Sequence, residues 1–226
     1  MPNTQYIKNL FFTPRVHSRV FFTTIIWNLV YFIAAMLLYP TPFSIRTVWI
    51  SSLGNPAIYN HVWMFNLGVF TTGLLLLYHF VYLEHHSNFL SPFIRIITIF
   101  ILSIGALGFL GIAIFTDNIQ PIHDYIAFFA FVGQGFGLAL FNMAIILAIF
   151  QRFRQSNPKK LMLLFLMTCG FVFFMLFAIC WFLSMYIIED FKIAEHILWE
   201  WLAFLGIISN LLWGQYIHET FFIKKP

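Results

Sequence analysis

The stretch FIRIITIFILSIGALGFLGIAIFT, residues 93–116, is apolar along almost its whole length and carries one charge, Arg95, close to its start. A helix of roughly 20 apolar residues is long enough to cross the hydrocarbon core of a bilayer. Five further runs of this kind lie at about residues 20–39, 62–83, 124–150, 161–187 and 195–216. The sequence therefore predicts an all-α polytopic membrane protein, a six-helix transmembrane bundle that occupies residues 1–226 as a single domain.

The composition of the chain supports this fold class. Hydrophobic residues make up 61% of the 226 residues and charged residues 9%, and the mean hydropathy of +0.87 is far above the range of ordinary soluble domains. The chain is polar up to Arg19, and no small-residue cleavage site follows the first apolar run. We therefore expect this run to stay in the membrane as the first span. Cys169 and Cys180 fall on one predicted helix, too far apart to form a disulfide.

Basic residues gather on one side of the predicted membrane. In a six-span arrangement one side holds Lys8, Arg15, Arg19, Arg95, Arg152, Arg154, Lys159, Lys160, Lys224 and Lys225, and the other holds Arg46 and Lys192. The positive-inside rule then predicts that both termini are cytoplasmic. The loop QRFRQSNPKK, residues 151–160, would face anionic lipid or a protein partner there. The net charge of +4 follows from this asymmetry and does not indicate a nucleic-acid surface.

Acidic residues and histidines gather on the opposite, outer side. The outer set is Asp117, Asp124, Glu189, Asp190, Glu195, Glu200, His61, His123 and His196. Ionisable groups near the ends of membrane helices are functional candidates, and histidines with carboxylates can bind a metal or transfer protons. The sequence therefore predicts a polar cavity that opens to the outer side.

Three segments supply this predicted cavity: residues 49–68, residues 115–137 and the stretch AEHILWEW, residues 194–201. In the last of them His196 and Glu200 are four positions apart and share one helix face. The predicted catalytic residues are His123, Asp124 and Glu200, the predicted binding residues are Ser52, Asn55, Asn66, Gln134 and Trp201, and the predicted metal ligands are His123, His196 and Glu200. A purely structural hydrogen bond between Glu200 and His123 is the competing interpretation, because a buried carboxylate needs a partner.

Short motifs in the same segments resemble the Frag1/DRAM/Sfk1 superfamily and its uncharacterised prokaryotic relatives. They are ISSLGNP before the second span, HD at the start of the fourth and EW at the start of the sixth. The resemblance covers nearly all six spans and implies a six-span membrane protein. Members are linked to remodelling of glycosylphosphatidylinositol anchors, to control of phosphoinositides or to autophagy, so it implies a fold more than one activity. The matching residues are Ser52, Gly54, Asn55, Pro56, His123, Glu200 and Trp201.

Several other polar and aromatic residues have a structural explanation. Glu195 and Asp190 suit helix capping and the helix dipole. The tryptophans lie mostly near span ends and suit interfacial anchors. His79 in the second span has no obvious histidine at matching depth, which argues against a haem ligand pair.

The sequence leaves three function classes open. The first is a protein that binds or remodels a membrane lipid in the outer cavity. The second is a hydrolase in which a divalent metal such as zinc activates water to cleave a lipid ester or amide. The third is a transporter or a membrane scaffold, and ion-coupled transport ranks last because no charged residue is expected at mid-depth. We expect a lipid-interacting protein of a bacterial or archaeal inner membrane, with a homo-oligomer or partner contact through residues 151–160.

Overall fold

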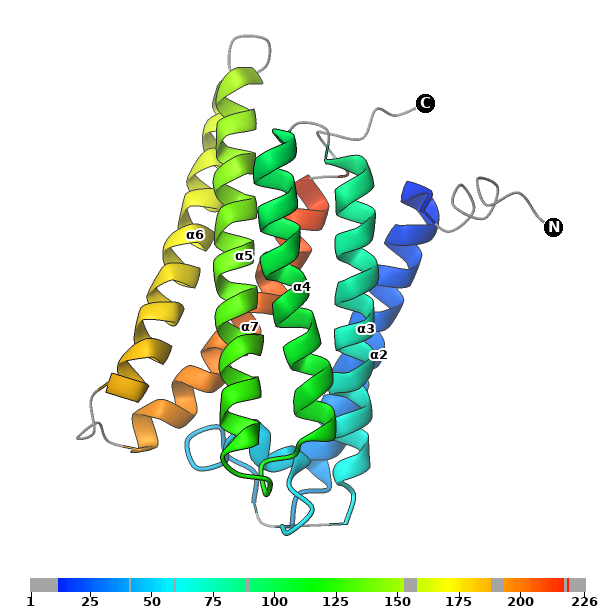
Figure 1. The fold of residues 1–226 in the computed structure, drawn as a ribbon, viewed down its shortest axis with the longest axis vertical. Helices are drawn as coiled ribbons and strands as arrows, with labels where there is room; N and C mark the ends of the chain where they lie inside the picture. Colours follow the sequence, from blue (N-terminus) through cyan, green and yellow to red (C-terminus); the bar gives the residue numbers. More distant parts are fainter. Residues whose placement is uncertain are drawn as a thin grey trace, which may run out of the picture.

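The computed structural model describes residues 12–40, 42–58, 60–87, 90–152, 158–187, 193–217 and 219, without the side chains at 151–152, 158–161, 181–187, 193–196 and 199. The described residues form six α-helices and one short 3-10 helix (Figure 1). They are α2 (Pro14–Leu37), η1 (Ser51–Gly54), α3 (Val62–His86), α4 (Pro92–Ile114), α5 (Ile122–Arg152), α6 (Pro158–Ile187) and α7 (Ile193–Ile217). The predicted all-α bundle is confirmed.

Local sequence sets where two of these helices begin. The Thr13 hydroxyl accepts the backbone N–H of Val16 at 3.3 Å, and Pro14 follows it at the start of α2. Ser91 caps α4 in the same way, with Pro92 next to it. A hydroxyl at the N-cap followed by proline satisfies a free helix N–H and fixes the first turn. As a result α2 starts at Pro14, before the apolar run predicted at residue 20. Its first, more polar helical turns are therefore part of the bundle.

Five of the helices are long and apolar enough to cross a membrane: Pro14–Leu37, Val62–His86, Pro92–Ile114, Ile122–Phe150 and Met162–Cys180. The described part of α7 is not among them. This helix places Glu200, Asn210 and Gln215 in its apolar run, and all three are buried inside the bundle. Polar groups that face other helices lower the hydropathy of a helix without exposing it to water. That α7 is a sixth span stays a prediction.

The helices run up and down, and neighbours in sequence pack side by side. In Figure 1 α7 crosses obliquely behind α4 and α5, and α2 lies behind α3 at the edge of the bundle. The beginning of α2 and the end of α7 lie at one end, which we name the terminal end. The connections from α2 to α3 and from α4 to α5 lie at the other, which we name the capped end. This arrangement agrees with the predicted pairing of connections, and the compartment at each end stays a prediction.

Small residues bring α4 and α5 into backbone contact. A Cβ atom added to Gly108 would lie 2.6 Å from the backbone nitrogen of Ala130. A Cβ atom on Gly105 would lie 2.6 Å from the backbone nitrogen of Gln134. Such close approach is typical of membrane helix pairs built on small residues. The close pair of α4 and α5 gives α3 and α7 a surface to pack against.

Candidate functional site

The segment from Val48 to Ala57, which contains η1, covers the capped end of the bundle and is anchored to α7; we name it the cap. The Trp201 indole N–H donates to the backbone carbonyl of Val48 at 2.9 Å. The Glu200 carboxylate accepts the backbone N–H of Ile50 at 2.8 Å, and Ser51 also approaches it. Glu200 and Trp201 are both buried. Two adjacent residues of α7 therefore hold the backbone of a segment about 150 positions earlier in the chain.

Other contacts tie the cap to the rest of the capped end. The Asn55 amide donates to the Asp117 carboxylate at 3.0 Å, which joins the two connections. The Asn66 amide, in the first turns of α3, donates to the Gly54 carbonyl at 3.4 Å. A Cβ atom on Gly54 would lie 2.5 Å from Asn66 Oδ1, so a larger residue would displace the Asn66 side chain where the cap meets α3. Burial, and then the Asp117 carboxylate, raise the pKa of the Tyr39 hydroxyl, so this group stays neutral.

A small polar chamber lies beneath the cap. Its polar lining comes from Ser51, His123 and Glu200, and its remaining walls are apolar. The space amounts to about 20 Å³, which is room for a water-sized group. The structure thus brings together two predicted catalytic residues, His123 from α5 and Glu200 from α7, and encloses them under the cap.

The tautomer of His123 follows from its hydrogen bond. Its Nδ1 lies 2.8 Å from the backbone carbonyl of Phe115, the residue that ends α4. A carbonyl only accepts, so Nδ1 carries the hydrogen, and in the neutral ring Nε2 keeps its lone pair. Among the described residues no hydrogen bond joins His123 to Glu200, so the structural pair considered from the sequence is replaced by two separate backbone partners. A buried imidazole with a free lone pair can accept a proton or bind a metal.

The other predicted site residues do not line the chamber. Asp124 is exposed in the first turn of α5, where the helix dipole favours a carboxylate. Gln134 is buried between α4 and α5 and donates to the Leu102 carbonyl at 2.9 Å, so it lies in a helix interface. Trp201, Asn55 and Asn66 anchor the cap, and Ser52 is buried within η1.

The predicted metal site is tested only in part. The side chain of His196 lies outside the described residues, whereas His123 and Glu200 line one chamber. Among the side chains that the structure describes, no group of three or more His, Cys, Asp or Glu residues is placed to hold a metal ion. The set of His123, His196 and Glu200 stays a prediction.

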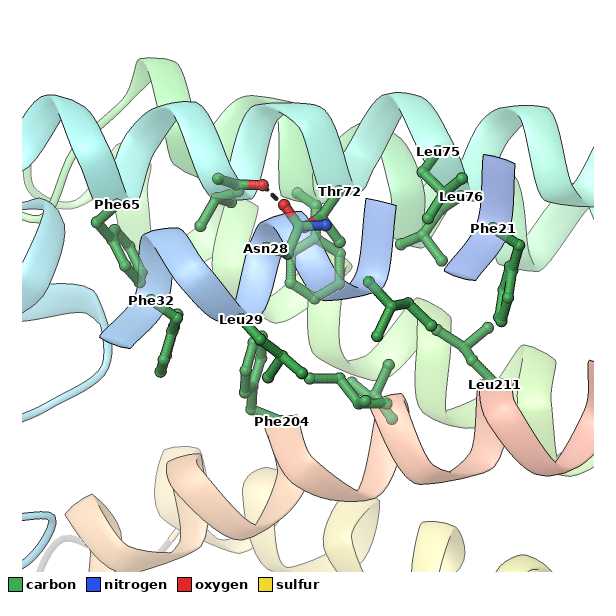
Figure 2. A pocket seen from close by; sticks show the side chains of 16 residues that line it. Phe21, Asn28, Leu29, Phe32, Phe65, Thr72, Leu75, Leu76, Phe204 and Leu211 are labelled. Carbon is green, nitrogen blue, oxygen red and sulfur yellow. Dashed lines mark hydrogen bonds between the residues drawn. The ribbon is translucent and has the colours of Figure 1, made fainter. Parts of the chain in front are cut away.

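A larger, apolar cavity lies deeper in the bundle, between α2, α3 and α7 (Figure 2). Figure 2 shows Leu29 and Phe32 of α2 facing Phe204 and Leu211 of α7 across it. The space amounts to about 750 Å³ when its open side is included. Its polar side chains, Asn28 and Thr72, have partners nearby: the Thr71 hydroxyl donates to Asn28, and the Thr72 hydroxyl donates to the Gly68 carbonyl. The surface left to a ligand is therefore almost wholly apolar.

The polar chamber and the apolar cavity adjoin each other. Four side chains line both: Phe65, Val69, Phe109 and Phe204. The cavity also reaches the outer surface of the bundle, because its lining residue Leu29 is 42% exposed. The site is thus an apolar space beside the lipid, with a small polar chamber at its capped end.

Sequence reasoning missed a buried polar cluster at the terminal end. His17 Nε2 lies 2.9 Å from His79 Nδ1, and both side chains are buried. The interpretation of His79 as a lone histidine was wrong, because α2 begins at Pro14 and carries His17 into the bundle. Antiparallel helices joined at one end pair the start of the first with the end of the second. The Thr-Pro capping signal ahead of His17 could have shown this pairing.

Comparison with known proteins identifies a family and no activity. The family described as a protein of unknown function (DUF998) matches residues 23–211, from the third turn of α2 to the last turns of α7. No curated protein and no solved structure matches the chain. Since the match spans most of the bundle and both cavities, the chain belongs to the DUF998 family of proteins of unknown function.

Proposed function

We propose that this integral membrane protein binds a membrane lipid, with an apolar chain of the lipid in the cavity between α2, α3 and α7 and its polar end in the chamber under the cap. The observation that carries the proposal is that the two spaces adjoin and share the lining residues Phe65, Val69, Phe109 and Phe204. An apolar space beside a small polar one matches the division of a lipid into chain and headgroup.

The surroundings of the apolar cavity favour a hydrocarbon chain as its occupant. The spanning part of α2 is the least buried of the five candidate spans, with 11% of its residues inside the bundle. In a bilayer its outer surface contacts lipid tails, and Leu29 joins that surface to the cavity. Water is scarce at this depth, and the cavity offers it few polar partners. A lipid chain can therefore enter beside α2 without crossing a polar barrier.

The chemistry of the chamber favours a headgroup that donates hydrogen bonds. The Glu200 carboxyl oxygens can accept a hydrogen bond, and in the neutral ring the lone pair at His123 Nε2 can accept one as well. A hydroxyl or ammonium group would satisfy both acceptors. The resemblance to the Frag1/DRAM/Sfk1 superfamily, some of whose members are linked to lipids, agrees with this proposal.

A metal-dependent lipid hydrolase is the second candidate. The observation that favours it is the free Nε2 lone pair of His123 in the chamber that also holds Glu200. Zinc bound there would polarise an ester or amide carbonyl and activate water. Elemental analysis of purified protein tests this alternative: zinc near one equivalent that is lost in His123→Asn supports it, and metal-free active protein contradicts it.

Filling the apolar cavity tests lipid binding. Leu29→Trp adds bulk to a residue that lines the cavity, so we expect the lipid retained through purification to fall several-fold, measured by native mass spectrometry and lipid extraction. Ile26→Trp is the matched control, because Ile26 is 62% exposed on the same helix and does not line the cavity. Equal lipid retention in the two variants and the parent protein would contradict the proposal.

A further inference from the structure

A chain of buried side chains joins α2, α3 and α7 at the terminal end. His17 Nε2 lies 2.9 Å from His79 Nδ1, and His17 Nδ1 lies 3.2 Å from Gln215 Nε2. The same Gln215 nitrogen donates to Glu219 at 2.5 Å. His17, His79 and Gln215 are at most 2% exposed. Neither the family match nor the proposed lipid site assigns a role to these residues.

With the Gln215 amide as the structure orients it, the hydrogen bonds of this chain run in one direction. An amide nitrogen donates and cannot accept, so the Gln215 NH₂ group gives one hydrogen to Glu219 and the other to His17 Nδ1. His17 must then carry its own hydrogen on Nε2 and donate it to His79 Nδ1. Turning the amide around would set the Gln215 oxygen against the Glu219 carboxylate. The contacts therefore define two neutral imidazoles.

An added proton would break one of the hydrogen bonds of this arrangement. A hydrogen on His79 Nδ1 would face the His17 Nε2–H, and a hydrogen on His17 Nδ1 would face the Gln215 amide hydrogens. Histidine is the side chain that normally changes charge between pH 5 and 8. In the described part of the three helices, the other ionisable groups close to the pair are Tyr78 and Tyr82, which stack on His17, His86, which stacks on Tyr82, and Glu219. In this arrangement, protonation of the pair breaks the hydrogen bond of His17 to Gln215 or the one to His79.

The position of this chain connects it to the apolar cavity. Phe21 contacts the rings of both His17 and His79, with centroid distances of 5.9 and 4.8 Å, and it also lines the cavity. At the other end of the cavity Phe32 of α2 stacks on Phe204 of α7 at 4.9 Å. Thus α2 is linked to α7 on both sides of the cavity, by aromatic rings towards the capped end and by His17 and Gln215 at the terminal end.

We propose that His17, His79 and Gln215 form a latch that protons release, and that its release lets the terminal half of α2 move away from α7 and widens the side entrance of the apolar cavity. The occupant of the cavity rests on the proposed function, and the latch itself rests on the contacts of these three residues. The hydrogen-bond chain supplies the switch, and α2, which lies at the edge of the bundle with 11% of its spanning part buried, supplies the moving part.

A distance measurement between α2 and α7 tests the latch. Spin labels at Val20→Cys and Tyr216→Cys, both on exposed positions, are introduced with Cys169 and Cys180 replaced by serine. The protein in lipid nanodiscs is measured by electron paramagnetic resonance at pH 8 and pH 5. We expect the distance to lengthen by several ångströms at pH 5. A distance that does not change with pH would overturn the proposal.

Three variants assign the effect to these residues. His17→Gln removes the titrating group and should abolish the pH response, whereas Gln215→Leu should give the long distance at both pH values. His61→Gln changes an exposed histidine at the start of α3 and should keep the full response. A response that persists in His17→Gln would also overturn the latch.

Lipid retained by the same samples separates the two proposals. Bound lipid with no change in distance contradicts the latch and leaves the lipid site standing. A pH-dependent distance without bound lipid contradicts the lipid site and supports the latch as a conformational switch.

Discussion

At the scale of single residues, the buried polar groups divide into those that hold the structure and those that face an open space. Trp201, Asn66 and Gln134 direct their polar atoms at backbone carbonyls of other segments, so their roles are structural. Glu200 does both, because it holds the Ile50 N–H and lines the chamber. Residue type and sequence position do not separate the two classes, since Glu200 and Trp201 are neighbours in the same helix turn. The sequence therefore identified which residues are buried and polar and could not identify the partners of each one.

Two substitutions at Glu200 separate its structural and binding roles. Glu200→Gln keeps an oxygen for the Ile50 N–H and removes the charge, so we expect nearly normal stability and a large loss of bound lipid. Glu200→Ala leaves a buried N–H without a partner and should lower the free energy of unfolding by about 1–3 kcal/mol. Asp124→Asn, at an exposed carboxylate outside the chamber, is the control and should change neither property. Thermal melting in detergent and lipid extraction measure both, and full lipid binding by Glu200→Gln would show that its charge is not used.

At the scale of helices, apolar length was a reliable guide and the register between helices was not. The predicted spans fall within each observed helix or within a few residues of its ends, because a bilayer requires long apolar helices whatever their neighbours are. The pairing of His17 with His79, or of Glu200 with Ile50, depends on how two helices or a helix and the cap are aligned. A single sequence carries little of that information, apart from capping signals and small residues.

The contact between α4 and α5 gives a prediction at this scale. Gly108→Ala places a methyl group 2.6 Å from the backbone nitrogen of Ala130, so the helices must separate. We expect a loss of about 1–3 kcal/mol, as for overpacked cores, seen as a lower melting temperature. Gly170→Ala on α6 is the matched control, because nothing lies within 4 Å of the added carbon. It should be neutral or slightly stabilising, since alanine favours a helix over glycine. Equal melting temperatures for the two variants would show that α4 and α5 are not in backbone contact.

At the scale of the whole molecule, the asymmetry between the two ends is the main feature. The capped end is closed by a segment that several helices hold in place, whereas the terminal end is where α2 meets α7 through the hydrogen bond between His17 and Gln215. An apolar cavity spans the distance between them. Residues of α7 hold the cap, line the cavity and contact His17. This helix must therefore run from one end of the bundle to the other with its polar residues buried.

The path of α7 through the membrane gives the last prediction. Reporters are fused after Pro226, inserted between Gln155 and Pro158, and inserted in the connection at residues 188–192. If α7 is a sixth span and the basic residues set the orientation, the first two reporters should be cytoplasmic and the third should lie on the other side of the membrane. The asymmetry of basic residues supplies the reason, because both cytoplasmic sites lie in or beside basic segments. Reporters after Pro226 and at residues 188–192 on the same side would show that α7 does not cross, and Glu200 and Gln215 would then lie on one side of the bilayer.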